Sequence, residues 1–315
     1  MNKLLLGKTI IKTSPIIFGG NVFGWTLNEK ESFEMLDLIS DLGINCIDTA
    51  DVYSRWHDNN TGGESETIIG NWMKSRGNRK KMIICTKAGM DMGQGGVDIS
   101  ESHMRKSIED SLKRLQTDYI DLFYAHKDDE KTAPEETLGV FKEYMDDRKI
   151  RYIGASNFSA ERLRAFMETS RKNELPAFTV FQPEYNLIER NQYEGAIEDV
   201  CKEYRLGVVS YFSLASGLLS GKYKTEADIE NSSRSSYVKK HWNQKTKDII
   251  DAVQTIANTH KVTPAAVALT WVLHSPTVTA PIVSATKKEH LQSFREASLL
   301  ELTRLEMKTL NEISS

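Results

Sequence analysis

Short apolar runs alternate with longer amphipathic segments along nearly the whole chain. Short runs rich in β-branched and aromatic residues are typical of buried strands, whereas apolar residues at helical spacing are typical of helices. We expect strands at residues 16–20, 45–50, 82–87, 119–126, 152–157, 179–184, 208–214 and 278–285. We expect helices between them at residues 29–42, 63–75, 100–115, 134–147, 159–171, 193–204, 247–260 and 287–296. This alternation predicts repeated βα units around a parallel sheet.

Four segments fall outside the alternation. Residues 3–14 are predicted to form a short hairpin, residues 264–274 an extra helix before the last strand, and residues 303–313 a final helix. Residues 215–244 are rich in Ser, Lys, Arg and Gly, and we expect no regular structure there. Because no composition shift or Pro- and Gly-rich linker marks a boundary, residues 1–315 are expected to form a single domain.

Eight βα units can close into a barrel. The sequence therefore predicts an α/β fold of the (β/α)8 TIM-barrel class, with an N-terminal β-hairpin, an extra helix before the eighth strand and a C-terminal helix. An open, doubly wound sheet is the alternative, but residues 19–24 match its glycine-rich turn poorly. In a barrel the carboxyl ends of all strands lie on one face, where active sites of this fold are found.

Polar residues that core packing does not require stand at the ends of three predicted strands. Asp48 ends the second strand, Lys87 follows 39 residues later at the end of the third, and His126 another 39 residues later at the end of the fourth. Equal spacing indicates equivalent places in successive units, and Asp48 is the obvious partner for a buried lysine. A nearby lysine lowers the pKa of a tyrosine, ordinarily near 10. With Tyr53, these residues could form a general acid for a carbonyl oxygen, while His126 hydrogen-bonds the substrate or shares the proton.

Other residues near the predicted strand ends suit ligand binding. Amides, hydroxyls and one aromatic ring, as an amide-bearing aromatic ligand would need, are found at Ser156, Asn157, Gln182 and Tyr211. Residues 284–288 precede a predicted helix and include two lysines, which indicates an anion site. Three large side chains hint at an apolar substrate pocket: Trp25, Trp56 and Met90.

Composition narrows the class of protein and its partners. Hydrophobic residues make up 39% of the 315 residues, and the 41 Lys and Arg against 44 Asp and Glu leave a net charge of −3. This balance predicts a globular protein without the basic field that holds nucleic acid or an anionic membrane. The first residues lack the apolar core of a signal peptide, and no window approaches a membrane span. Cys46, Cys85 and Cys201 are too few for a disulfide framework and lack metal-ligand spacing, so we expect no metal and a cytoplasmic location.

At these residues the chain resembles the aldo-keto reductase superfamily, from the hairpin to about residue 300. The motifs that carry the resemblance are residues 48–53 (DTADVY), 63–66 (GESE), 86–87 (TK), 154–158 (GASNF), 182–186 (QPEYN) and 217–223 (GLLSGKY). The chain is similar both to bacterial-type NADPH-dependent members and to potassium-channel β-subunit-like members. The resemblance implies a (β/α)8 barrel that uses NADPH to reduce aldehydes or ketones.

The resemblance also implies a role for each matching position. Tyr53 would be the proton donor, Asp48 and Lys87 the pair that tunes it, and His126 the residue that orients the substrate. The cofactor-binding positions would be Gly20, Asn21, Asp48, Ser156, Asn157, Gln182, Tyr211, Leu214, Ser216, Lys222, Ser284, Thr286, Lys287, Lys288 and His290. Within this set, the residues from 156 to 211 would hold the nicotinamide. Those from 214 to 222 would close over the pyrophosphate, and those from 284 to 290 would meet the adenosine 2′-phosphate.

Some positions depart from the family pattern. Residues 212–214 (FSL) stand where relatives usually have Ser-Pro-Leu, and Thr286 and Phe294 stand where relatives often have Arg and Asn. Ser284 replaces a common Gly or Lys. Lys287 and Lys288 can still hold a phosphate as point charges, although without the bidentate fork of arginine. The expected cofactor is NADPH, with NADH as an alternative.

Three functions stay open. The first is an oxidoreductase that acts on a small carbonyl substrate, and the second is a cofactor-sensing subunit with little turnover, as in superfamily members attached to ion channels. The third is a lyase that uses Lys87 as a Schiff-base amine, which leaves Tyr53, Gln182 and Tyr211 unexplained. The sequence identifies neither the substrate nor a protein partner.

Overall fold

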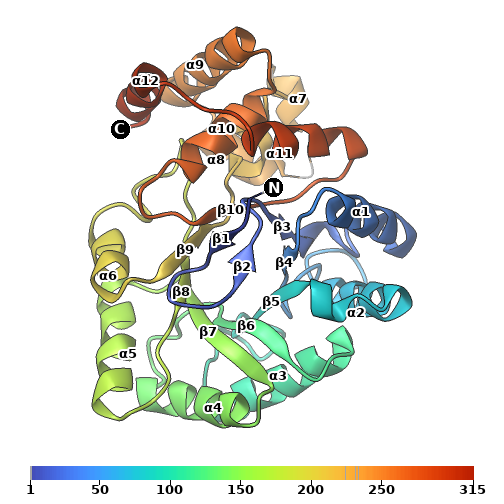
Figure 1. Cartoon of the computed structure of the whole chain (residues 1–315), viewed down its shortest axis with the longest axis vertical. Helices are drawn as coiled ribbons and strands as arrows, with labels where there is room; N and C mark the ends of the chain where they lie inside the picture. Colours follow the sequence, from blue (N-terminus) through green and yellow to red (C-terminus); the bar gives the residue numbers. More distant parts are fainter. Residues whose placement is uncertain (1, 224, 231, 233) are drawn as a thin grey trace.

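Parallel strands form a closed barrel at the centre of the computed structural model, which describes residues 2–223, 225–230, 232 and 234–315 (Figure 1). Around the barrel the strands follow the order β10-β3-β4-β5-β6-β7-β8-β9. Their bounds are β3 (Ile17–Gly19), β4 (Cys46–Asp48), β5 (Ile83–Ala88), β6 (Ile120–Ala125), β7 (Ile150–Ser156), β8 (Val180–Gln182), β9 (Gly207–Ser210) and β10 (Ala280–Val283). The predicted (β/α)8 class is confirmed, with each strand close to its expected place.

Helices surround the barrel, as Figure 1 shows. The predicted ones are α1 (Glu29–Asp41), α2 (Glu64–Arg76), α3 (Glu101–Leu115), α4 (Pro134–Asp146), α5 (Ala160–Lys172), α6 (Ala196–Tyr204), α9 (Gln244–His260) and α11 (Leu291–Ala297). Side-chain caps fix several starts: Asn28 forms a capping box with Glu31, and Ser159 accepts a hydrogen bond from the backbone N–H of Arg162. Helix α9 begins three residues earlier than predicted because Asn243 caps it.

The predicted additions are also present. The hairpin consists of β1 (Leu4–Leu5) and β2 (Lys12–Thr13), and α10 (Pro264–Leu273) and α12 (Arg304–Ser314) are the extra and final helices. Gly7 in the hairpin turn has a φ of 57°, and a Cβ there would fall 2.4 Å from the backbone N of Gly207, at the start of β9. A glycine is therefore needed where the hairpin approaches the N-terminal end of the barrel.

The β9–α9 segment, defined as residues 211–243, corrects one prediction. We expected no regular structure over residues 215–244, yet the segment contains η3 (Ala215–Ser220), α7 (Glu226–Glu230) and α8 (Ser235–His241). Short helices of this kind lack a long periodic pattern in the sequence. Tertiary packing holds them, since Ile229 and Val238 are buried in the main core. Shorter helical turns elsewhere are η1 (Gly20–Val22), η2 (Arg79–Lys81) and η4 (Lys288–His290).

Alternate strand residues point into the barrel and, with Leu6 and Ile11 of the N-terminal hairpin, form a core of their own. This inner core comprises Leu6, Ile11, Ile17, Cys46, Cys85, Leu122, Tyr124, Val180, Val209, Ala280 and Ile282. Two residues beyond Cys46, Cys85, Tyr124 and Val180 along the chain stand Asp48, Lys87, His126 and Gln182. The strand period therefore stacks these polar side chains on the inner core at the carboxyl end of the barrel.

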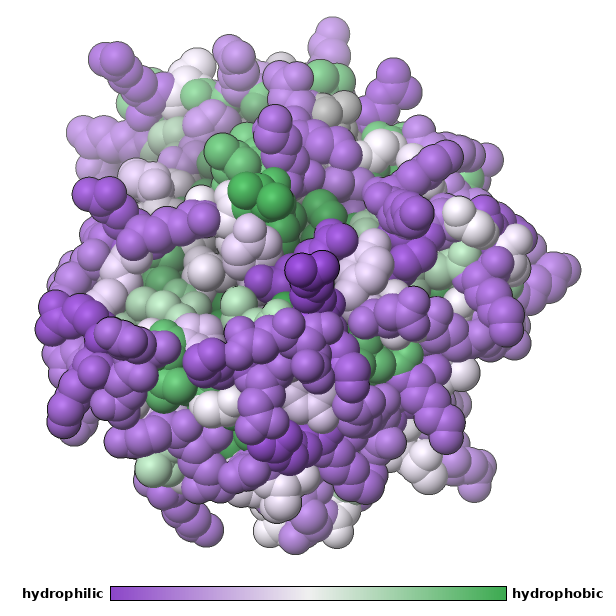
Figure 2. All heavy atoms as spheres, turned by 60° about the horizontal axis from the view of Figure 1, so that its bottom comes forward, coloured by the Kyte–Doolittle hydropathy of each residue, from purple (hydrophilic) through white to green (hydrophobic). Residues whose placement is uncertain are grey.

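Hydrophilic residues cover most of the face seen in Figure 2, where hydrophobic residues form small, separate patches. Among the described residues, the exposed large hydrophobic side chains are Leu5, Ile10, Trp56, Phe212, Leu299 and Leu305. Two of these, Trp56 and Phe212, follow β4 and β9 at the carboxyl end of the barrel. Over the described ranges, no helix has both the length and the apolar composition needed to cross a membrane.

Candidate active site

Lys87 is the centre of the hydrogen-bond network at the carboxyl end of the barrel. Its Nζ donates to a carboxylate oxygen of Asp48, to the carbonyl oxygen of Thr49 at 2.7 Å and to the hydroxyl of Tyr53 at 3.1 Å. Lys87 and Asp48 are both buried. The ammonium therefore has three oxygen partners, which compensate for its loss of water.

The backbone after β4 wraps around Lys87 and returns Tyr53 to it. The backbone N–H of Thr49 donates to the carbonyl of Cys85, and that of Asp51 to the carbonyl of Lys87, so pairing with β5 continues beyond the strand. A turn then follows, closed by a hydrogen bond from the Tyr53 N–H to the carbonyl of Ala50 at 3.2 Å. Local backbone geometry thus places Tyr53 and Lys87 side by side.

His126 follows β6 at the same rim. Its backbone N–H donates to the carbonyl of Ala88, and its ring centroid lies 6.2 Å from that of Tyr53. Its Nδ1 is buried and has no hydrogen-bond partner within the described part of the chain. Burial, and then the charge of Lys87, hold the pKa of His126 well below its usual range. The imidazole is therefore neutral near pH 7, able to donate one hydrogen bond but unable to supply a proton as a cation.

The pKa of Tyr53 corrects a second expectation. Burial raises the pKa of Tyr53, and Lys87 offsets only part of this effect. Burial alone would lower the pKa of Lys87, but Asp48 and Tyr53 together raise it above its ordinary value, while burial raises the pKa of Asp48. The predicted net lowering of the Tyr53 pKa is wrong because burial outweighs the charge of Lys87, and the charge of Asp48 also opposes Lys87. Tyr53 is a protonated phenol with an ammonium beside its oxygen.

A second buried acid, Asp51, lies behind this network. Glu66, on α2, accepts hydrogen bonds from Thr86 at 2.6 Å and from Arg114 at 2.7 Å. The Oδ1 of Asp51 is buried without a partner among the described residues. Burial, and then the charge of Glu66, raise the pKa of Asp51 to about 8, with Arg114 and Lys87 opposing. Asp51 is therefore largely protonated at neutral pH.

The amides and hydroxyls of β7 and β8 adjoin the same network. The hydroxyl of Ser156 donates to the carbonyl of Gln182 at 2.8 Å, and the Nε2 of Gln182 donates to Asp48 at 2.9 Å. The Nδ2 of Asn157 donates to the carbonyl of His126 at 2.9 Å, and its Oδ1 accepts from the hydroxyl of Tyr211 at 2.7 Å. Residues from five strand ends (β4, β6, β7, β8 and β9) are thus connected in one group.

Aromatic side chains form a wall beside Tyr53. The ring of Trp56 lies 5.8 Å from that of Tyr53 and 5.6 Å from that of Trp25, with edge-to-face contacts in both pairs. Met90, three residues after Lys87, is half-buried at the same end of the barrel. The two tryptophans are brought together from separate loops, and whether they contact a substrate stays a prediction.

Basic side chains gather from the β9–α9 segment and from the residues after β10. Burial lowers the pKa of His290, and so do the charges of Lys287, Lys222 and Arg234. The guanidinium of Arg234 lies 5.8 Å from the ring centroid of Trp25. No carboxylate lies within ion-pair distance of these three cations among the described side chains. Repulsion among cations with no ion-paired carboxylate, opposed in part at His290 by the charge of Glu289, is the pattern of a site for an anion.

Arg234 is a residue that the sequence analysis missed. It stands alone in a Ser-rich stretch that we expected to be irregular. The only available signal was the arginine itself, because nothing local indicates that this stretch approaches Trp25.

The remaining predicted cofactor positions follow β3, β9 and β10. The hydroxyl of Ser284 donates to the carbonyl of Gly19 at 2.7 Å and contacts the side chain of Asn21. Gly217 has a φ of 95°, and a Cβ there would fall 2.4 Å from the Cε of Lys222, so the lysine folds back over a glycine. The other predicted positions are Gly20, at the end of β3; Leu214 and Ser216, in the β9–α9 segment; and Thr286 and Lys288, after β10.

The chain is similar to known proteins over nearly its whole length. The Aldo/keto reductase family model matches residues 15–315. A Bacillus subtilis (strain 168) protein described as "Uncharacterized oxidoreductase YrpG" is 33% identical over 99% of this chain and 96% of its own length. "Aldo-keto reductase YhdN" of the same organism is 33% identical over 94% of this chain and 86% of its own. A rice (Oryza sativa subsp. japonica) protein described as "Probable voltage-gated potassium channel subunit beta" is 30% identical over 91% and 88%.

Proposed function

Because the chain belongs to the aldo/keto reductase family and is an oxidoreductase, we propose that it reduces aldehydes or ketones to alcohols with NADPH, with Tyr53 as proton donor. Enzymes of this family act on small carbonyl substrates and generally use NAD(P)H.

One observation carries it: the Tyr53 hydroxyl lies 3.1 Å from the Nζ of Lys87, whose charge is secured by Asp48. A raised pKa keeps Tyr53 protonated at neutral pH, which is the form that a proton donor needs. As the proton moves to the carbonyl oxygen, the phenolate that is left faces an ammonium. Lys87 thereby lowers the cost of a charge that appears only during the reaction.

His126 orients the substrate in this proposal. A neutral imidazole beside Tyr53 can donate a hydrogen bond to the carbonyl oxygen without competing for the proton. The Trp25 and Trp56 wall would cover the apolar part of the substrate.

The donor set fits a nicotinamide dinucleotide. The amide and hydroxyl groups of Ser156, Asn157 and Gln182 suit a carboxamide, and the ring of Tyr211 suits stacking against a flat heterocycle. The basic group of Lys222, Arg234, Lys287 and His290 has a surplus of positive charge, which suits phosphates. Gly20, Asn21, Leu214, Ser216, Ser284, Thr286 and Lys288 complete the proposed binding surface. When bound, the reduced cofactor supplies the hydride that the protein itself lacks.

The proposal includes one domain over residues 1–315 and a cytoplasmic location. The continuous barrel supports the first. Three buried cysteine thiols, of which Cys46 and Cys85 have sulfurs 3.7 Å apart, suit a reducing compartment.

The test is the loss of reduced-nicotinamide absorbance with NADPH or NADH and a panel of aldehydes, ketones, diones and quinones. We expect turnover with NADPH, and a loss of about 10³-fold in Tyr53→Phe. Tyr119→Phe, at the opposite end of the barrel beside Arg79, is the control and should retain wild-type turnover. Turnover of Tyr53→Phe within a few-fold of wild type would contradict the assigned donor.

A cofactor-sensing subunit is the second candidate, favoured by the likeness to the rice protein. Tight cofactor binding without turnover on any carbonyl of the panel would support it over the reductase.

A further inference from the structure

The backbone that carries Tyr211 is held by the loop after β8. The N–H of Tyr211 donates to the carbonyl of Pro183 at 2.9 Å, and the N–H of Tyr185 donates to the carbonyl of Tyr211 at 3.4 Å. Directly after Tyr211, Phe212 has a φ of 52°, a left-handed conformation that costs a non-glycine residue about 1 kcal/mol. Something in the surrounding structure must hold this strained residue in place.

Asn186 supplies that restraint. Its Nδ2 donates to the carbonyl of Phe212 at 3.1 Å, while its Oδ1 accepts from the backbone N–H groups of Ile188 at 2.8 Å and Glu189 at 2.9 Å. The side chain is completely buried. A single amide thus ties the loop of residues 183–195 to the residue that follows Tyr211.

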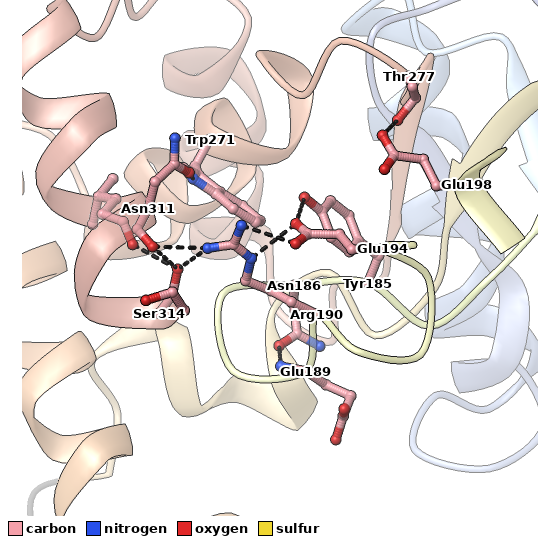
Figure 3. A network of polar contacts seen from close by, with 12 residues as sticks. Tyr185, Asn186, Glu189, Arg190, Glu194, Glu198, Trp271, Thr277, Asn311 and Ser314 are labelled. Atoms are coloured by element: carbon pink, nitrogen blue, oxygen red, sulfur yellow. Dashed lines mark hydrogen bonds and ion pairs between the residues drawn. The ribbon is translucent and has the colours of Figure 1, made fainter. Parts of the chain in front are cut away.

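Arg190 fastens the other side of this loop to the C-terminal helix (Figure 3). Its guanidinium binds both carboxylate oxygens of Glu194, at 2.8 and 2.9 Å. Its Nη1 also donates to the carbonyl of Asn311 and to the hydroxyl of Ser314, both on α12 and both at 2.8 Å. These contacts use the planar fork of arginine in two directions, which a lysine cannot reproduce.

Aromatic packing reinforces the same junction. The Arg190 guanidinium lies 5.6 Å from the ring centroid of Trp271 on α10, whose Nε1 donates to the side chain of Asn311 at 2.8 Å. The Tyr185 ring lies 5.2 Å from that of Trp271, and its hydroxyl donates to Glu194 at 2.7 Å. Figure 3 shows these side chains converging on Arg190 from the loop and from the C-terminal helices.

We propose that Arg190 is a positioning residue for the cofactor: it clamps the loop of residues 183–195 to α12, so that Asn186 holds Phe212 left-handed and Tyr211 faces the nicotinamide. The C-terminal helix then belongs to the binding machinery although it lies outside the barrel. The inference rests on the proposed function, because it assigns Tyr211 to the nicotinamide.

The alternative is that Arg190 only stabilises the fold. Measuring cofactor affinity together with stability distinguishes this alternative from a positioning role. Arg79 provides a matched control because it also bonds a carboxylate (Asp121) and a backbone carbonyl (Tyr119) and covers an aromatic ring. The Arg79 side chain is 15% exposed and that of Arg190 17%. Arg79 lies next to the N-terminal ends of β5 and β6, away from the candidate site.

The experiment measures the Kd of NADPH by calorimetry and the Tm of the free protein for wild type, Arg190→Met, Arg79→Met and Asn186→Ala. We expect Arg190→Met and Asn186→Ala each to weaken NADPH binding about 10-fold. The double variant should also be weakened about 10-fold rather than about 100-fold, because both act through one loop. Arg190→Lys should recover only part of the affinity. Arg79→Met should lower the Tm to a similar extent but leave the Kd within two-fold.

The proposal is overturned if Arg190→Met lowers the Tm but leaves the Kd of NADPH unchanged, or if Arg79→Met weakens binding equally. A Kd of NADPH raised about 100-fold in the double variant Arg190→Met/Asn186→Ala would also overturn it, because the two residues would then act independently. If Arg190→Met does not fold, Ser314→Ala removes one contact to α12 and should weaken binding about two-fold, and no change there would count against the proposal. Failure of the wild-type protein to bind any nicotinamide cofactor would instead remove the proposed function itself.

Discussion

At the ends of β4 and β5 the buried charges Lys87 and Asp48 form an ion pair, whereas Lys222, Arg234 and Lys287, after β9 and β10, have no ion pair within the described part of the chain. Lys87 is buried against Asp48, Thr49 and Tyr53. By contrast, burial and then the charges of Lys287, Lys222 and Arg234 lower the pKa of His290 against the charge of Glu289, and no carboxylate among the described residues forms an ion pair with these three cations. The first group has its charges paired within the protein, whereas the second has positive charge that suits the proposed phosphate site.

In the proposed function, the paired charges around Lys87 serve proton transfer and the unpaired basic side chains serve phosphate binding. The Lys87 group must have its geometry before a substrate arrives, because a preorganised charge needs no rearrangement during the reaction. The basic group can tolerate repulsion in the free protein, because bound phosphates would turn that repulsion into affinity. Substitutions in the two regions should therefore change stability in opposite directions.

The largest expected effect comes from Lys87→Met. It leaves the carboxylate of Asp48 buried without its cation, so we expect a loss of about 3 kcal/mol in the free energy of unfolding, measured by urea denaturation. Turnover should fall about 10³-fold. Combining Lys87→Met with Asp48→Asn should restore most of the stability and none of the turnover. Stability of the single variant equal to that of wild type would show that the pair is not desolvated.

Unlike Asp48, the buried Asp51 has a carboxyl oxygen without a hydrogen-bond partner among the described residues. Its contribution to the free energy of unfolding should depend on pH. Its pKa is raised to about 8 in the folded protein, so between about pH 4 and 8 the folded state binds a proton that the unfolded state has lost. The free energy of unfolding should therefore fall as pH rises through this range. Relative to Asp51→Asn, which cannot ionise, we expect wild type to lose about 2 kcal/mol between pH 5 and 6.5 in urea denaturation. Parallel profiles for the two proteins would mean that Asp51 is ionised throughout.

Arg234→Ala should give the smallest change in stability, with the opposite sign. Removing one of several mutually repelling cations should leave the Tm of the free protein unchanged or slightly higher, while NADPH binds about 10-fold more weakly. The wild-type Kd should also depend more steeply on salt than that of the variant. Lys30→Ala, at an exposed position on α1, is the control. An unchanged Kd in Arg234→Ala would remove this residue from the proposed phosphate site.

Prediction from the sequence succeeded where the signal was local or periodic. The strands, most helices and the Lys87–Asp48 pair follow from apolar runs that end in polar residues at equal spacing. It failed over residues 215–244, where short helices are held by burial of Ile229 and Val238 rather than by a repeating pattern. It also gave the wrong direction for the Tyr53 pKa, because the degree of burial is a property of the packed structure.

The sequence by itself determined the barrel, the polar strand ends and the family, since each depends on short motifs or on spacing along the chain. The tertiary structure decided which distant residues cooperate. It alone brings Arg234 to Trp25, and it alone joins α12 to the loop that holds Phe212. The physical reason is that these contacts join residues far apart in sequence through single hydrogen bonds and ring contacts, which leave no periodic trace in the chain.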